Sequence, residues 1–304
     1  MCAQEVDLDR AFVERVAPFR KELLAHCYRM TGALSDAEDA LQDALVRAWR
    51  HLGGFEGRAS LRTWLYRVAT HACLDLIAGR RGRTLPHLVE ADDREPSWLE
   101  PFPDAAIEDD PDTRPDAVYA RREATRLAFI AALQRLPARQ RAMLILRDVV
   151  ALSSEEAAAA LDVSVATANS LLQRARDELG ADAHRRPTRA TGAMRDELLA
   201  RFLRAWESGD PAQLIAVLRK DAITTMPPAA LWLSGREAIA DFVTANVWPR
   251  GPLRLVPTLA NDAPAFAVYL PHGFGWLMVV ELDDDAISAF HSFRAIDPAR
   301  YPVG

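Results

Sequence analysis

Cysteine is scarce in this sequence. The 304 residues contain only Cys2, Cys27 and Cys73, which are too few and too scattered for a disulfide framework or a CxxC metal site. His26 and His71 lie close to two of these cysteines, but both pairs fall in helical, apolar-periodic segments, where a buried thiol is commoner than a zinc ligand. We therefore expect no metal site.

Long apolar runs are also absent. No stretch approaches the roughly 18 residues of a membrane-spanning helix, and residues 1–20 lack the basic and apolar regions of a signal peptide. The sequence contains no P-loop and no GxGxxG motif, so it offers no recognisable nucleotide site. These absences predict a cytoplasmic protein with no cofactor and no membrane partner.

The net charge hides an uneven distribution along the chain. The formal net charge of −6 at pH 7 argues, taken alone, against a nucleic-acid partner. Residues 58–83, however, contain six arginines and one acid, whereas residues 90–116 contain eleven acids and two arginines. A basic helical segment of this kind can bind phosphates whatever the charge of the whole chain.

Length and periodicity divide the chain into domains. An apolar content of 50% over 304 residues supplies cores for two or three of them. Helical periodicity predicts a bundle over residues 1–84, whose second helix starts at a Ser35–Glu38 capping box and buries a stripe from Ala37 to Trp49. Residues 85–115 form an acidic linker with six prolines, and residues 116–186 form a second, smaller helical domain.

The pattern changes in residues 193–304, where helices come first and strands follow. Helices followed by an antiparallel sheet predict an α+β domain, so the fold class is multi-domain, with two all-α domains and an α+β tail. The candidates for acid–base chemistry in the tail are Asp221, Glu237, Asp241 and His291. None lies in a recognisable catalytic motif, so structural roles are favoured and we expect no catalytic residue.

Residues 153–176 predict a helix-turn-helix. Ser153 and Glu156 have capping-box spacing, and Ser164 is placed to cap a second helix after a short turn. The far face of this second helix carries polar side chains, namely Thr167, Asn169, Ser170, Gln173, Arg174 and Arg176. Asn, Gln and Arg pair bidentately with base edges, which suits a DNA major groove. An ordinary solvated helical hairpin is the alternative.

Four motifs in one order resemble the bacterial RNA polymerase sigma factors of the extracytoplasmic-function type, in the sigma-70 family. They are Asp36–Asp43 with Ala48-Trp49, Thr63–Ala69, Leu136–Arg141 and Arg174–Arg176. Residues 193–304 resemble a SnoaL-like domain of the NTF2-like type, a match of shape and of short phrases such as Pro264–Tyr269. Sigma factors with such a tail and a tryptophan-proline motif in the linker form a subgroup that this chain resembles throughout.

The resemblance implies that the chain is not an enzyme and has two partners, core RNA polymerase and promoter DNA. Core polymerase would dock through its β′ clamp helices and β flap. The clamp helices would meet a face of the second helix that carries Asp39, Gln42, Asp43 and Arg47. A merely solvated helix face has the same composition.

The resemblance also implies that both helical domains bind DNA. The first would capture a flipped base of the minus-10 element beside a phosphate track, with candidates Arg58, Ser60, Arg62, Arg67, Arg80, Arg81 and Arg83. The second would read the minus-35 element with Asn169, Ser170, Gln173 and Arg174 on base edges, and Thr167 and Arg176 on phosphates. The family commonly has a basic residue where Ala168 and Asn169 stand, so the promoter sequence is not transferable.

The linker and the tail suggest regulation in cis. Trp98 and Phe102 are aromatic residues in an otherwise solvated linker, which predicts docking either onto the tail or in the RNA path of the polymerase. A local cluster within the linker fits the same pattern. The aromatic content of the tail suggests a small-molecule, apolar ligand. Two alternatives remain: a free-standing, ligand-responsive helix-turn-helix regulator, and an enzyme tethered to a DNA-binding module. Only the sigma-factor hypothesis gives the acidic helix face at 36–43 a partner.

Overall fold

The computed structural model describes residues 12–52, 60–80, 99–106, 124–180, 192–227, 229–283, 285–294 and 296–301. These residues fall into two compact units. The helical unit contains the described residues up to 80 and residues 124–180, and the tail unit contains residues 99–105 and 192–301. The domain boundaries predicted at residues 84, 115 and 186 lie outside the described residues.

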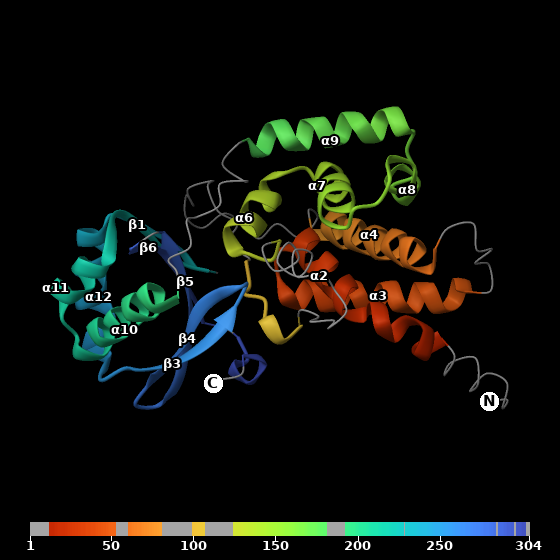
Figure 1. Cartoon of the computed structure of the whole chain (residues 1–304). Helices are drawn as coiled ribbons and strands as arrows, with labels where there is room; N and C mark the ends of the chain where they lie inside the picture. The colour runs from red at the N-terminus through yellow and green to blue at the C-terminus, as the bar shows by residue number, and fades with distance from the viewer. Residues whose placement is uncertain are drawn as a thin grey trace, which may run out of the picture. The chain divides into compact units, whose positions relative to one another are not determined.

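Three packed helices form the first part of the helical unit (Figure 1). They are α2 (Arg20–Thr31), α3 (Leu34–His51) and α4 (Leu61–Arg80). A 3-10 turn, η1 (Ala17–Phe19), precedes α2, and its Pro18 lacks the N–H that the interior of an α-helix needs. Gly32 ends α2 with a φ of 80°, a left-handed conformation in which glycine has no Cβ to clash.

Two details of α3 differ from the prediction. The helix begins at Leu34, its N-cap is Ala33, and Ser35 lies inside the first turn, so the predicted Ser35–Glu38 capping box is wrong. The buried stripe runs along Ala37, Ala40, Leu41, Ala44 and Ala48, but Trp49 is 48% exposed and lies outside this core. Trp49 stands seven residues after Gln42, so helical geometry places it on the polar face of α3.

The second part of the helical unit carries the predicted helix-turn-helix (Figure 1). Its elements are α6 (Leu127–Arg135), α7 (Ala138–Leu144), a π-helical turn η4 (Ile145–Val149), α8 (Ser154–Ala160) and α9 (Val165–Leu179). α8 packs against both α4 and α9, and α7 packs against α9. The two helical parts of the chain therefore share one compact unit.

The tail unit combines three helices with one mixed sheet. The helices are α10 (Gly192–Ser208), α11 (Pro211–Val217) and α12 (Arg236–Asn246), followed by a 3-10 turn, η6 (Trp248–Arg250). The strands are β1 (Leu218–Met226), β2 (Ala229–Ser234), β3 (Arg254–Ala260), β4 (Ala263–Leu270), β5 (Gly273–Asp283) and β6 (Ala286–Phe293). Their order is β2-β1-β6-β5-β4-β3. The predicted α+β class is confirmed.

The sheet corrects the prediction in two places. β2 was not predicted as a strand, and it pairs antiparallel with β1. β1 pairs with β6 in parallel, through Thr224 with Phe290 and Thr225 with His291, so the sheet is mixed and not wholly antiparallel. This parallel pairing joins residues such as Thr225 and His291, which lie 66 positions apart, and no turn signal in the sequence marks it.

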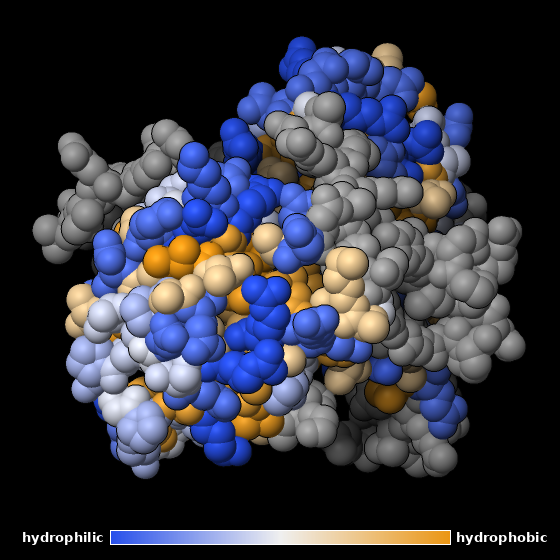
Figure 2. Space-filling view, turned by 60° about the vertical axis from the view of Figure 1, so that its left-hand side comes forward, coloured by the Kyte–Doolittle hydropathy of each residue, from blue (hydrophilic) through white to orange (hydrophobic). Residues whose placement is uncertain are grey.

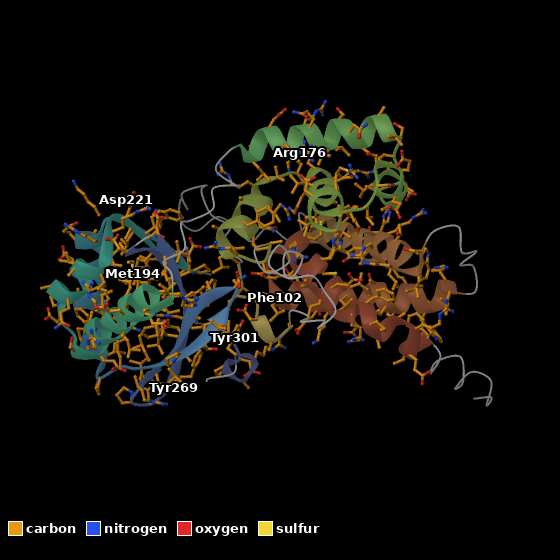
Figure 3. The ribbon with its side chains drawn as sticks, in the orientation of Figure 1. Phe102, Arg176, Met194, Asp221, Tyr269 and Tyr301 are labelled. Carbon is orange, nitrogen blue, oxygen red and sulfur yellow. The ribbon has the colours of Figure 1, made fainter. Side chains whose placement is uncertain are left out.

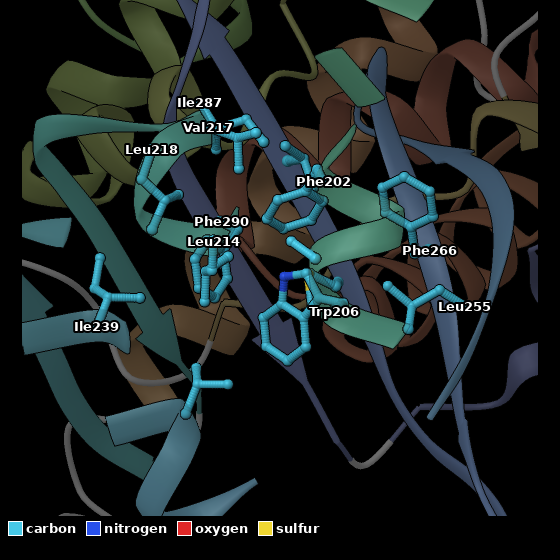
Figure 4. Packing of buried hydrophobic residues seen from close by; sticks show 14 of the residues in the cluster. Phe202, Trp206, Leu214, Val217, Leu218, Ile239, Leu255, Phe266, Ile287 and Phe290 are labelled. Carbon is cyan, nitrogen blue, oxygen red and sulfur yellow. The ribbon is translucent and has the colours of Figure 1, made fainter. Parts of the chain in front are cut away.

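An aromatic cluster fills the space between the helices and the sheet of the tail unit (Figure 4). Phe202 and Trp206 of α10 contact Phe290 of β6, with ring centroids 5.9 and 5.7 Å apart. Phe266 of β4 lies on the other side of Phe202 at 6.0 Å. Trp206 and Trp276 are both buried, and their indole nitrogens have no acceptor among the described residues.

The described part of the chain contains no helix that is long and apolar enough to span a membrane. The two cysteines that it includes, Cys27 and Cys73, are buried on α2 and α4. Their contact is a thiol hydrogen bond, which together with burial raises the pKa of Cys73. The neighbouring His26 donates to or accepts from the hydroxyl of Thr70 at 3.0 Å.

Candidate nucleic-acid and polymerase-binding surfaces

The helix-turn-helix is built by local capping. Ser153 accepts the N–H of Glu156, whose carboxylate accepts the N–H of Ser153 at 2.9 Å, and this reciprocal pair confirms the predicted capping box. Ser164 accepts the N–H of Thr167, so the predicted cap of α9 is confirmed as well. Between the helices Asp162 has a φ of 52°, a left-handed conformation that aspartate tolerates better than most residues.

The outward face of α9 carries the predicted DNA-reading side chains. Ala168, Leu172 and Ala175 are buried against the rest of the domain. The six predicted residues, Thr167, Asn169, Ser170, Gln173, Arg174 and Arg176, are all exposed. Figure 2 shows mainly hydrophilic residues at the top of the molecule, where α9 lies in Figure 1. The helix therefore presents donors and acceptors on a face that no core packing occupies.

Two of these side chains have partners within the same domain. Gln173 donates to Asp177 at 2.8 Å. Arg176 donates twice to the carboxylate of Asp148, at 2.7 and 3.1 Å, and this hydrogen bonding raises the pKa of Arg176 (Figure 3). A DNA phosphate would have to compete with Asp148 for that guanidinium.

The predicted phosphate track lies partly on α4. Ser60 caps this helix by accepting the N–H of Thr63. Arg62 donates to both carboxylate oxygens of Glu22, and its guanidinium lies 4.9 Å from the ring centre of Tyr66. Arg67 is exposed and donates to Asp162 at 2.6 Å. Arg58, Arg81 and Arg83 and the side chain of Arg80 lie outside the described residues.

The predicted polymerase-docking face lies on α3. Asp39, Gln42 and Asp43 are exposed. Arg47 bridges Asp43 of its own helix and Asp75 of α4, at 2.6 Å in each case. Hydrogen bonds to these two carboxylates, led by Asp75, raise the pKa of Arg47.

Two apolar side chains extend this face and were missed from the sequence. Val46 is 40% exposed and Trp49 is 48% exposed. Val46 follows Gln42 by four residues and Trp49 follows it by seven, so the helical period places all three side by side. The spacing of four and seven residues from Gln42 is the feature of the sequence that could have placed Val46 and Trp49 on this face. The face of α3 is consequently amphipathic and offers an apolar contact ringed by charges, as a protein-binding surface does.

Part of the acidic linker is bound within the tail unit. Phe102 is fully buried. Its N–H donates to the Asn261 side chain at 2.7 Å, and its carbonyl accepts the Asn261 N–H at 2.9 Å. Asp104 accepts the N–H of Asp262 at 2.9 Å, and the hydroxyl of Tyr301 donates to the carbonyl of Pro101 at 2.9 Å.

We call residues 99–105 the docked segment. It meets the β3–β4 hairpin at its two-residue turn, where Asn261 and Asp262 have φ values of 57° and 54°. Phe102 and Tyr301 lie close to the sheet in Figure 3. Trp98, the other aromatic residue for which docking was predicted, lies outside the described residues.

The acid–base candidates of the tail are dispersed. Asp221 is exposed and pairs with Arg219, and Glu237 is exposed and pairs with Arg236. Asp241 is exposed on α12. His291 is buried on β6, where its Nδ1 lies 2.8 Å from the hydroxyl of Thr225. These four residues do not converge on one site.

Comparison with known proteins shows the family of the two helical segments first and then that of the whole chain. Residues 16–83 match the family model of Sigma-70 region 2, and residues 126–179 match that of Sigma-70, region 4. The ECF RNA polymerase sigma factor SigG of Mycobacterium tuberculosis is 44% identical over 312 residues, which cover 96% of this chain and 82% of SigG. This chain belongs to the ECF sigma factors of the sigma-70 family.

The likeness to other ECF sigma factors extends through the tail. SigJ of Mycobacterium tuberculosis is 28% identical over 249 residues, which cover 79% of this chain and 74% of SigJ. The crystal structure of SigJ from the same species covers 96% of this chain with a TM-score of 0.65 and 23% identity, a likeness of fold. We therefore refer to α2–α4 as region 2 and to α6–α9 as region 4.

Proposed function

We propose that this ECF sigma factor directs core RNA polymerase to promoters by reading two DNA elements with its two sigma regions. The outward face of α9 carries the proposal, because Asn169, Gln173 and Arg174 are exposed on the second helix of a correctly capped helix-turn-helix. These side chains have the donor and acceptor patterns that distinguish base edges in the major groove. Ser170 adds a further base contact, and Thr167 and Arg176 bind phosphates of the minus-35 element.

In the same proposal, region 2 binds the opened minus-10 element. Single-stranded DNA is held by a positive track along its backbone and by pockets for unstacked bases. Arg67 on α4 and Ser60 at its start face solvent and supply the described part of that track, whereas Arg62 positions α4 through its bond to Glu22. Arg58, Arg80, Arg81 and Arg83 complete the track by sequence alone.

The α3 face docks core polymerase. Asp39, Gln42, Asp43 and Arg47 supply polar contacts, and Val46 and Trp49 supply the apolar centre around which such contacts become strong. We assign this face to the β′ clamp helices and assign region 4 to the β flap. The protein would accordingly work in the cytoplasm, where core polymerase is.

The tail regulates this activity in cis, without catalysis. The bonds between the docked segment and the β3–β4 turn support this role, because they tie the linker between regions 2 and 4 to the tail unit. A small apolar molecule with one or two acceptor oxygens is the ligand class we propose for the tail. Its support is the aromatic interior, in which the indole nitrogens of Trp206 and Trp276 have no acceptor among the described residues.

The test is binding of the full-length protein to core RNA polymerase, by gel filtration and by pull-down. We expect a complex with the wild type and at least a tenfold weaker one with Val46→Asp, since a buried charge opposes an apolar contact. Val13→Asp is the matched control, because Val13 is an exposed valine that precedes region 2 in the chain and is not part of the proposed face of α3. Failure of the wild type to bind core polymerase, together with tight duplex binding without it, would favour a free-standing regulator instead.

A further inference from the structure

One face of α4 is covered by carboxylates of region 4. Thr63, Arg67 and His71 are spaced by four residues, so they form a single stripe along the helix. The hydroxyl of Thr63 donates to Glu156 at 3.0 Å, Arg67 donates to Asp162 at 2.6 Å, and Nε2 of His71 lies 3.1 Å from the same carboxylate. We call Glu156 and Asp162 the acidic edge; they begin and end α8 and its turn.

Arg67 differs from the other paired arginines in where its partner lies. Arg62 pairs with Glu22 inside region 2, and Arg176 pairs with Asp148 inside region 4. Those two ion pairs survive any movement of one region relative to the other. The bond of Arg67 to Asp162, and the approach of His71 to the same carboxylate, exist only while the two regions are in contact.

A second part of the contact between the regions is a buried polar network at the end of α2. Arg141 and Gln134 of region 4 donate to the carbonyls of Met30 and Arg29, which the end of the helix leaves without intrahelical partners. Gly32 lets Gln134 approach, because a Cβ on Gly32 would lie 2.9 Å from the Gln134 side chain. This network holds the regions together, and the half-exposed acidic edge contributes a weaker, salt-sensitive part.

This closed arrangement is incompatible with simultaneous reading of two promoter elements. Elements centred roughly 25 base pairs apart are separated by about 85 Å at 3.4 Å per step. α4 and α8, by contrast, are within hydrogen-bonding distance of each other. A chain that reads both elements must therefore have separated its two sigma regions, and the acidic edge must have left α4.

We propose that the acidic edge is a built-in substitute for the DNA backbone: in the free protein Glu156 and Asp162 occupy the stripe on α4 that binds phosphates of the opened minus-10 strand. This inference rests on the proposed function of region 2. Two carboxylates on a hydroxyl, a guanidinium and an imidazole reproduce the contacts of successive phosphates. Because the side chains of Arg67 and Asp162 are 47% and 55% exposed, their ion pair is weak and is readily displaced when the regions open.

The test uses the full-length protein without polymerase and a fluorescent single-stranded DNA oligonucleotide of mixed sequence, read by anisotropy over a salt series. Asp162→Asn keeps the side-chain size and tolerates the left-handed backbone of the turn. We expect it to bind the oligonucleotide about three- to tenfold more tightly than the wild type at low salt. Glu155→Gln is the matched control, because Glu155 is an exposed acid on the same helix and its change removes the same charge.

The gain must depend on Arg67. In an Arg67→Ala background, Asp162→Asn should do no more than Glu155→Gln does. Equal gains from Asp162→Asn and Glu155→Gln in the wild-type background would overturn the proposal, because the effect would then be net charge alone. If that result came with normal binding of core polymerase, the acidic edge would be refuted and the sigma-factor function would stand.

Discussion

Phe102 anchors the docked segment, and its removal tests whether the linker is held to the tail. The side chain is fully buried, and its backbone exchanges two hydrogen bonds with Asn261. Substitution Phe102→Ala removes the buried ring and leaves the hydrogen-bonding groups in place. The change therefore weakens the attachment without deleting its polar contacts.

The magnitude follows from burial. Replacing a buried phenylalanine by alanine costs about 3–5 kcal/mol where the site cannot collapse. The transfer of the ring out of water accounts for about 1.5–3 kcal/mol of this. The docked segment is short and lies at a hairpin turn, so it can open without unfolding the tail, and we use about 3 kcal/mol. At 1.4 kcal/mol per decade this corresponds to about a hundredfold larger open population.

Hydrogen exchange measures this population. The amides of Asn261 and Asp262 donate to Phe102 and Asp104, so their protection reports directly on docking. We expect it to fall about a hundredfold in Phe102→Ala while amides in β5 keep theirs. Phe274→Ala, an aromatic deletion beside Tyr269 in the same unit, is the control and should leave both amides protected. Unchanged protection in Phe102→Ala would refute the assignment of Phe102 as the anchor.

Three further predictions concern the helical unit. Gln173→Ala should cost about 1–3 kcal/mol at particular minus-35 bases in holoenzyme binding assays, and equal losses on all sequences would contradict base reading. Ser153→Ala should lower the unfolding free energy by about 1 kcal/mol in urea, whereas Ser35→Ala, at a position that is not a cap, should cost less than half of that. Burial and then the charge of Arg29 lower the pKa of His26 from 6.5 to about 3, so stability is complete above pH 6.5 and falls by about 1.4 kcal/mol per unit below it. Since an unfolded histidine is half protonated at pH 6.5, the unfolding free energy should fall by about 1 kcal/mol between pH 6.5 and 5.5 in the wild type, and this loss should be absent in His26→Gln.

The parts of the fold that depend on local chemistry could be read from the sequence. The capping box at Ser153, the cap at Ser164 and the outward face of α9 are encoded within a few residues of each other. The same reasoning was wrong at Ser35, because the chain enters α3 in an extended conformation at Ala33, two residues earlier than the polar pattern indicates. The spacing of capping residues indicates that a helix begins nearby. The conformation of the preceding chain determines the residue at which it begins.

The parts that depend on distant partners could not be read. β2 has no alternation of apolar and polar residues, and it is a strand because its backbone pairs antiparallel with β1. Trp49 was assigned to the core as the last residue of the apolar stripe of α3, but it is exposed, and its position on the helix puts it beside Gln42 and Val46. The bonds between region 2 and region 4 involve residues such as Arg67 and Asp162, which lie 95 positions apart. The sequence shows that each of these residues is charged, but it does not show which residue it pairs with.

These partners change what the charge of the chain means for DNA binding. The arginines on the two proposed DNA faces are not equivalent donors, because three of them already have a carboxylate. Arg62 is held hardest: Glu22 is 18% exposed and also accepts the hydroxyl of Tyr66, so releasing Arg62 would leave a poorly hydrated acid. Arg176 pairs with a partly exposed acid, and Arg67 pairs with a half-exposed one that region 4 carries away when the regions separate. The order of availability to phosphate is therefore Arg67, then Arg176, then Arg62, and only the first depends on opening. It follows that Arg67→Ala should reduce DNA binding by the polymerase complex more than by the free protein, whereas Arg176→Ala should weaken the two alike.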